Sequence, residues 1–93
     1  MAELLAEDEI AARLEDSEWQ REGDEIAREF KFEDFATAMA FVNRVAETAE
    51  EANHHPDILV HGWNKVRLSL TNHSAGGLTA VDFEMAGRFD ALS

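Results

Sequence analysis

The sequence predicts an α+β fold with two layers, in which a four-stranded antiparallel sheet carries helices on one face. Three observations lead to this prediction. Two pairs of short strand-like segments are each followed by a helical segment, and a short helix precedes the first pair, so the order is α-ββ-α-ββ-α. The helical segments are amphipathic and therefore need a surface to cover. The chain has 93 residues, which suits the single domain that we expect over residues 1–93.

The first helix is expected at residues 7–15. Its first turn is acidic, which suits the positive N-terminal end of a helix dipole. Its apolar residues share one face: Ile10, Ala11 and Leu14.

Two strands are expected next, at residues 19–22 and 26–32. Gly23-Asp24 joins them, and this dipeptide is typical of a two-residue hairpin turn. In the second strand the side chains of Ile26, Phe30 and Phe32 alternate onto one face, and Arg28 is the exception on that face.

The longest helix is expected from Glu33 to Asn53. Apolar residues recur in it at three- and four-residue steps, which predicts one buried stripe: Phe35, Met39, Val42, Val45, Ala46 and Ala49. Pro56 disfavours helical angles at His55, so the chain must leave the helix near His54.

The last part of the chain predicts a second hairpin and a helix. Strands are expected at residues 58–61 and 65–71, the second with Val66, Leu68 and Leu70 facing inward. A loop covers residues 72–77. Thr79 and Asp82 have the spacing of a capping box, which opens a helix with this apolar stripe: Leu78, Val81, Met85, Phe89 and Leu92.

The composition excludes several classes of function. The chain has no cysteine, which rules out disulfides and thiolate metal sites. Its net charge is −12 and its isoelectric point is near 4.5, so nucleic acid is not expected as a partner. No apolar run is long enough to cross a membrane and the N-terminus lacks a basic start, so we expect a soluble, cytoplasmic protein.

The acidic residues are unevenly distributed. Residues 1–51 carry 16 acidic and five basic side chains, whereas residues 52–93 carry four and three. The excess of acidic residues in the first half allows two interpretations. It can be a solubilising surface, or it can be a halophilic adaptation to a salt-rich cytoplasm, because salt screens the self-repulsion of a highly charged protein.

Three of the four histidines form the candidate catalytic group. Imidazole changes its charge near neutral pH and can therefore exchange protons under working conditions. His54 is expected at a helix end and His55 on the outgoing strand, so that both can face one small molecule. His73 follows the last strand, in a loop that a rigid support would hold. A helix-end histidine can also serve only as a cap, and a loop histidine can simply be solvated.

Other residues around the histidines allow two readings each. Trp63 can be a core residue or a flat wall against a planar ring. Asp82 fits a helix cap, and Glu50 can orient a histidine or belong to a solvated helix face. His61 lies inside a predicted strand and is read as a structural or surface residue. A zinc site is a further alternative, but the adjacent spacing of His54 and His55 suits converging metal ligands poorly, so we expect no metal.

At these positions the chain closely resembles the pterin-4a-carbinolamine dehydratase family. The resemblance extends over residues 10–91. It is carried by an acidic residue, a His-His-Pro triplet, an aromatic residue, a histidine and an aspartate at fixed spacing, here Glu50, His54, His55, Pro56, Trp63, His73 and Asp82.

The resemblance implies a hydro-lyase that eliminates water from 4a-hydroxytetrahydropterin, of the 4a-hydroxytetrahydrobiopterin type, to give the quinonoid dihydropterin. This step recycles the cofactor of aromatic amino acid hydroxylases, so a functional link to such an enzyme is implied. The pterin is the substrate, and no cofactor is expected. The resemblance further implies a homodimer or homotetramer. It assigns catalysis to His54, His55 and His73, and substrate binding to Glu50, Pro56, Trp63 and Asp82.

The roles of the individual histidines are a hypothesis. The negative end of the helix dipole favours the charged form of His54, which would donate to the leaving hydroxyl. His73 would accept the N5 proton, and His55 and Trp63 would position the ring. Relatives often have a charged residue where this chain has Val81, a difference that bears on substrate affinity. The alternative function is a non-catalytic oligomeric interaction or assembly protein with the same fold; family members with that role lack the histidines.

Overall fold

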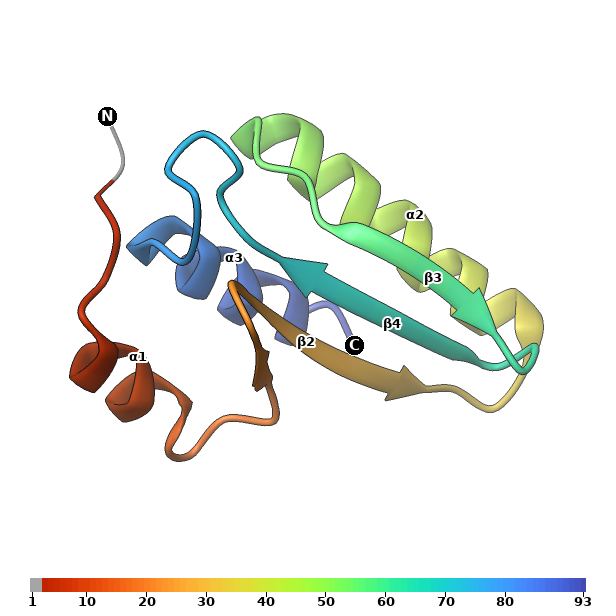
Figure 1. The fold of residues 1–93 in the computed structure, drawn as a ribbon. Coiled ribbons are helices and arrows are strands. Elements are labelled where there is room, and N and C mark those ends of the chain that lie inside the picture. Colours follow the sequence, from red (N-terminus) through yellow and green to blue (C-terminus); the bar gives the residue numbers. More distant parts are fainter. Residues whose placement is uncertain (1–2) are drawn as a thin grey trace.

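The computed structural model describes residues 3–93 and contains a layer of strands covered on one face by helices (Figure 1). The elements follow in the predicted order: α1 (Glu7–Leu14), β1 (Gln20–Glu22), β2 (Glu25–Lys31), α2 (Phe35–Ala52), β3 (Asp57–His61), β4 (Lys65–Leu70) and α3 (Ala80–Asp90). The four strands form one antiparallel sheet with the order β1-β2-β4-β3. The predicted fold class is therefore confirmed.

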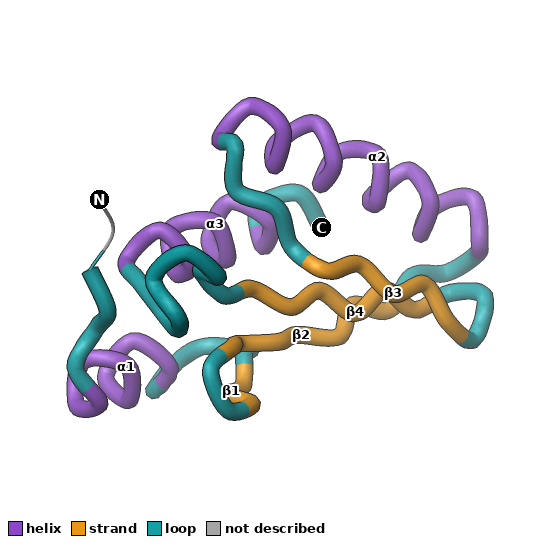
Figure 2. Tube along the Cα trace, turned by 45° about the horizontal axis from the view of Figure 1, so that its top comes forward, coloured by secondary structure: helices purple, strands orange, loops and turns teal. Residues whose placement is uncertain are grey.

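Helices α2 and α3 lie on the same face of this sheet, as Figure 2 shows from the side. Helix α1 lies at the end of the sheet near β1 and adds Ile10 to the same core. The largest fully buried side chains of the core come from α2, α3, β2 and β4: Phe41, Phe89, Ile26, Leu68, Leu70 and Met85. Among residues 3–93, none of the helices has the length and apolar character needed to span a membrane.

Helix α2 is rotated relative to the predicted stripe. The ring of Phe41 packs between Phe30 and Phe32, with centroids 4.7 and 5.0 Å apart, and this contact fixes which side of the helix faces the sheet. Phe35 is 55% exposed and Ala46 is also exposed, so their predicted burial was wrong. The buried stripe consists of Ala38, Phe41, Val45 and Ala49.

The contacts of Arg28 explain why a charged residue lies on the otherwise apolar face of β2. Its guanidinium lies 4.2 Å from the centre of the Phe30 ring and forms an ion pair of 2.6 Å with Asp90 at the end of α3. The indole N–H of Trp19 donates to the same carboxylate at 2.9 Å. Asp90 thus ties β2 and the segment before β1 to the C-terminal end of α3.

The N-terminus of α2 is capped by Asp34, whose carboxylate accepts a 2.7 Å hydrogen bond from the Thr37 N–H. Hydrogen bonds from the Thr37 side chain and backbone hold the pKa of Asp34 below its usual value. A lowered folded-state pKa contributes stability above the pKa of the unfolded carboxyl, and this stability is lost as the pH falls through the folded pKa.

We therefore expect Asp34→Ala to lower the melting temperature by a few degrees at neutral pH, because the helix loses its cap. The difference from the unmodified chain should shrink below about pH 4, where the carboxyl becomes protonated. Asp34→Asn is the matched control, since asparagine caps helices without titrating. Melting curves of the three proteins between pH 3 and 7 measure this. A difference that is constant over this range would contradict the argument.

Candidate functional site

The C-terminal end of α2 sets the backbone of the first candidate histidine. Asn53 adopts a left-handed conformation (φ 53°, ψ 41°), which asparagine tolerates better than most residues, and it ends the helix. The N–H of His54 then reaches back to the carbonyl of Ala49 at 3.1 Å, as in a Schellman motif. The predicted exit of the chain near His54 is confirmed. Pro56 follows it and leads directly into β3.

His54 is in contact with a fully buried carboxylate. Its Nε2 lies 2.6 Å from Oδ1 of Asp82, which has no exposed surface. The other carboxylate oxygen of Asp82 accepts from the backbone N–H of Thr79 at 2.8 Å and from the Thr79 hydroxyl at 3.2 Å. The predicted capping box at the start of α3 is present. The same aspartate therefore closes the helix cap and holds the histidine.

The burial of Asp82 corrects one sequence expectation. Val81 was expected on the buried stripe of α3, but it is 37% exposed, and its neighbour Asp82 points inward instead. A buried carboxylate is costly unless it is hydrogen-bonded, and here Thr79 and His54 supply the donors. The capping geometry therefore sets the rotation of this first helical turn.

The contact with Asp82 also decides which nitrogen of His54 carries a proton. A carboxylate oxygen only accepts hydrogen bonds, so Nε2 is the donor. Nδ1 remains for a ligand, as an acceptor when the ring is neutral and as a donor when it is charged. A carboxylate behind an imidazole orients the ring and balances the positive charge that develops during proton transfer.

His55 is held more loosely on the surface. Its Nε2 lies 2.8 Å from Oε1 of Glu50, one turn back on α2, and both side chains are more than half exposed. Glu50 therefore orients His55 from the solvent side, in accordance with one of its two predicted roles.

His73 lies in a loop that Asn72 organises. The carbonyl of Asn72 accepts from the N–H groups of Ala75, Gly76 and Gly77, and its side chain accepts a further bond from Ala75 at 3.0 Å. The loop is thus ordered by its own backbone, and it presents His73 to solvent at the end of β4.

The three histidines line one open cleft of about 220 Å³, where the end of α2 meets the end of β4. Four polar residues that sequence reasoning did not single out complete the lining: Asn53, Thr71, Asn72 and Ser74. Three of them, Asn53, Asn72 and Ser74, adjoin a histidine in sequence, and Asn53 had a recognisable signal as an asparagine at a helix end. All side chains that line the cleft are polar.

Trp63 is not part of this cleft within the chain. It occupies the turn between β3 and β4, at the other end of β3 from the histidines (Figure 1). His61, the fourth histidine, ends β3 and contacts Glu29 on the sheet face that carries no helix. It is half-buried and outside the cleft, in agreement with its reading as a structural or surface residue.

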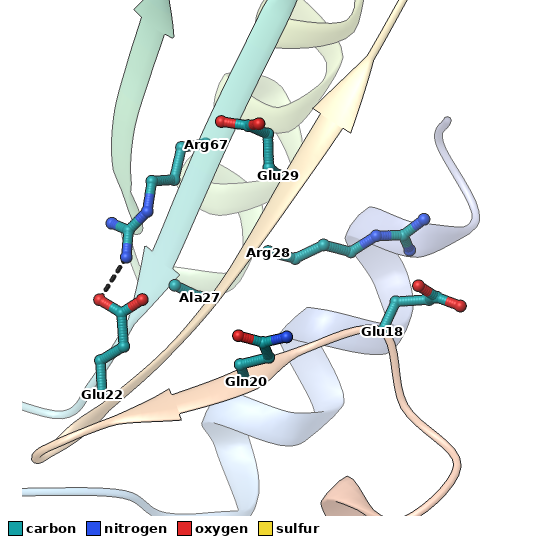
Figure 3. Close-up of a pocket in the computed structure, with 7 residues that line it drawn as sticks. All are labelled: Glu18, Gln20, Glu22, Ala27, Arg28, Glu29 and Arg67. Carbon is teal, nitrogen blue, oxygen red and sulfur yellow. Dashed lines mark hydrogen bonds and ion pairs between the residues drawn. The ribbon is translucent and has the colours of Figure 1, made fainter.

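Two larger hollows lie away from the histidines. The hollow in Figure 3, about 330 Å³, is lined mainly by Glu18 and by charged and polar side chains of β1, β2 and β4, and Arg67 forms an ion pair with Glu22 in it. This pair raises the pKa of Arg67 above its usual value. The other hollow, about 430 Å³, lies between residues 3–9 and the start of α3. Within residues 3–93, no three histidine, aspartate or glutamate side chains are grouped closely enough to hold a metal ion.

Comparison with known proteins gives a consistent result. A family model described as pterin 4 alpha carbinolamine dehydratase matches residues 3–92. A protein of Picosynechococcus sp. is 50% identical over 99% of this chain and all of its own length. One of Natronomonas pharaonis is 44% identical over the whole chain and 99% of its own. Both are provisionally named pterin-4-alpha-carbinolamine dehydratase.

Two solved structures share the fold. A transcriptional coactivator/pterin dehydratase from Brucella melitensis superposes with a TM-score of 0.88 at 36% identity, covering 95% of this chain and 96% of that one. A pterin dehydratase-like protein described as a RuBisCO assembly factor in the alpha-carboxysome superposes with a TM-score of 0.65 at 28% identity. That match covers 80% of this chain and 84% of the other.

Proposed function

This chain belongs to the pterin-4a-carbinolamine dehydratase family, and we propose that it is a hydro-lyase that dehydrates a 4a-hydroxytetrahydropterin at the histidine cleft. The observation that carries this proposal is the cleft itself. Three imidazoles line it, and the buried carboxylate of Asp82, which lies behind the cleft, fixes the tautomer of His54. Such an arrangement supplies both a proton donor and a proton acceptor near neutral pH.

The reaction needs one proton delivered and one removed. In the proposed mechanism His54 donates a proton from Nδ1 to the 4a-hydroxyl, the C4a–O bond breaks and water leaves. His73 removes the proton from N5, whose electron pair forms the new N5=C4a double bond of the quinonoid dihydropterin. His55, oriented by Glu50, positions the ring. General acid–base catalysis of this kind contributes about 10²–10⁴-fold. The pterin is the substrate, and the mechanism uses no further cofactor.

The direct test is the decay of freshly generated 4a-carbinolamine, followed by absorbance with and without the protein. The proposal expects catalysed decay that saturates with substrate. Decay at the uncatalysed rate in the presence of folded protein would refute it. Varying the side chain at C6 of the pterin in the same assay identifies the preferred substrate, and the tetrahydrobiopterin derivative is the first to use. We further propose that an aromatic amino acid hydroxylase produces the carbinolamine on which this protein acts.

A non-catalytic assembly role is the second candidate, because a structural neighbour is described as a RuBisCO assembly factor. The feature that favours catalysis over this role is the presence of all three cleft histidines, together with the Asp82 contact. The absorbance assay separates the two functions, since an assembly protein of this fold would leave the carbinolamine decay unchanged.

We also propose that the protein works as a homo-oligomer in a salt-rich cytoplasm. A 93-residue chain buries only a modest fraction of its surface, and association increases that fraction. The net charge of −12 opposes compact folding at low ionic strength, and about 0.1 M salt already reduces the screening length to about 10 Å.

Added potassium chloride is therefore expected to raise the melting temperature steadily from low salt towards molar concentrations. Differential scanning calorimetry over this range measures the effect. The control is the same titration near pH 4.5, close to the isoelectric point, where the net charge is small and the salt effect should be much weaker. A melting temperature that stays level or falls with salt at neutral pH would exclude the halophilic interpretation.

A further inference from the structure

The two lysines of the chain lie directly opposite each other in the sheet. Lys31 and Lys65 are the only lysines in the sequence, and they are register partners on the neighbouring strands β2 and β4. Side chains that face each other in this way have Cβ atoms about 4.5–5.5 Å apart, and like charges in such a pair repel. Two ammonium groups are thus held close together in a protein whose net charge is −12.

Both lysines lie on the sheet face that carries no helix. The preceding pair across β2 and β4 is Phe30 and Val66, and both of these side chains are buried in the core. Because successive side chains of a strand point to opposite faces, the next row points away from the helices. That row consists of Lys31 on β2, Lys65 on β4 and His61 on β3. Lys31 is exposed and Lys65 is half-buried.

Neither lysine forms an ion pair with a carboxylate within residues 3–93, although acidic residues outnumber basic ones by 20 to eight. In the same part of the chain five of the six arginines pair with a carboxylate, and Arg44 donates to the Leu92 carbonyl. The fold therefore uses the charge of its arginines, whereas the charge of the two lysines remains available to a ligand.

The acidic residue that precedes Lys31 on this face of β2 is Glu29, and it contacts His61. Its Oε1 lies 2.5 Å from Nε2 of the imidazole, which donates to it. The ammonium of Lys65 lies over the turn between β3 and β4, since a side chain at position 62 would begin 3.3 Å from its Nζ. Gly62 therefore leaves the space that this ammonium occupies.

A phosphate group is the ligand that suits this pair of lysines. Lysine binds phosphate as a point charge, and two lysines supply the two positive charges that balance a phosphate dianion. The phosphate oxygens point in several directions, so one phosphate can accept hydrogen bonds from both ammonium groups. A bound anion also removes the repulsion between the lysines, so that binding stabilises the folded chain.

We propose that Lys31 and Lys65 bind a phosphate group on the open face of the sheet, either as free phosphate or as the phosphate monoester of a small molecule. The site is separate from the histidine cleft, because Lys65 begins β4 and the cleft lies where β4 ends. The proposal does not depend on the dehydratase function. The protein as a whole repels anions, so saturable binding of phosphate requires a local arrangement of positive charge.

An NMR titration of the isotopically labelled protein with inorganic phosphate tests the site. Potassium chloride keeps the ionic strength constant. The backbone amide signals of Lys31 and Lys65 should shift and saturate, with a dissociation constant of about 1 mM that corresponds to two charge-assisted contacts. Glycerol 3-phosphate is titrated in parallel: tighter binding of this ester assigns the site to a monoester, and tighter binding of inorganic phosphate assigns it to the free ion. The absence of saturable shifts with both compounds would overturn the proposal.

A matched pair of variants locates the binding. Lys31→Gln and Arg88→Gln each remove one positive charge from an exposed side chain, the second on α3. Lys31→Gln should weaken phosphate binding at least about tenfold, because one charge-assisted contact is lost. Arg88→Gln should bind as the unmodified chain does. An equal loss in both variants, or full affinity in Lys31→Gln, would show that the lysine pair is not the site.

Melting curves give a second measurement of the same site. Without phosphate, Lys31→Gln should melt about 1–4 °C above the unmodified chain, because the repulsion between the lysines is gone. About 20 mM phosphate should reverse this order, because a ligand that binds the folded state stabilises it and the variant has lost the ligand. Potassium chloride at the same ionic strength is the control and should leave the order unchanged. If the two proteins keep the same order in phosphate, the proposal is wrong.

Discussion

Replacing His54 with alanine is expected to lower kcat for carbinolamine dehydration by about 10²–10⁴-fold, the usual contribution of a general acid. The loss has two physical causes. The substrate loses its proton donor, and Asp82 loses the imidazole that its Oδ1 contacts at 2.6 Å. Steady-state kinetics with freshly generated substrate measure the effect. The variant should also lose one limb of the bell-shaped dependence of kcat on pH, and added imidazole should restore part of the rate.

The fourth histidine supplies the matched control for this experiment. His61→Ala removes an imidazole outside the cleft, where the ring contacts Glu29 on the sheet face without helices, and kcat should remain within about twofold. His73→Ala should resemble His54→Ala, with loss of the opposite limb of the pH profile. A His73→Ala protein with full activity would show that another group removes the N5 proton.

Replacing Asp82 with alanine is expected to have the second large effect, on stability as well as on rate. The substitution leaves the N–H of Thr79 and the imidazole of His54 without their acceptor inside the protein. Loss of a helix cap and of a buried acceptor together should lower the free energy of unfolding by about 2–4 kcal/mol. Urea unfolding curves measure this loss, and kcat should fall because His54 is no longer held in one orientation.

Asp82→Asn separates the two roles of this residue. The amide oxygen can still accept from Thr79 N–H, so most of the capping energy should remain. The amide carries no charge and cannot balance a positive imidazole, so kcat should fall at least tenfold although the protein is nearly as stable. Glu84→Ala, on an exposed position of the same helix, is the control for both measurements. Normal kcat in Asp82→Asn would limit the aspartate to capping.

The order of the elements could be predicted from the sequence because each depends on local patterns. Alternation in β4, the turn residues Gly23-Asp24 and the helix exit forced by Pro56 are all properties of a few neighbouring residues. The rotation of α2 could not be predicted in the same way. Phe35 and Phe41 both fit a helical stripe, and the packing of Phe41 between Phe30 and Phe32 decides between them.

In the candidate site, too, local motifs could be predicted from the sequence, whereas contacts between distant segments could not. The histidines and the capping box were visible as short motifs, and the gathering of the three histidines in one cleft is a consequence of the fold. The contact between His54 and Asp82 joins residues 28 positions apart, so it depends on where the end of α2 meets the start of α3. The distance of Trp63 from the cleft also follows from the strand that lies between them, and the motif spacing alone does not reveal it.

Asp82 both caps α3 and holds His54, so the temperature at which activity is lost should depend on the stability of the first turn of α3. Helix ends open more readily than whole domains, and opening the first turn of α3 would release the carboxylate from Thr79 and His54 together. Activity should therefore disappear on warming several degrees before the sheet and α2 melt. Amide exchange at Thr79 would report that opening well below the global transition.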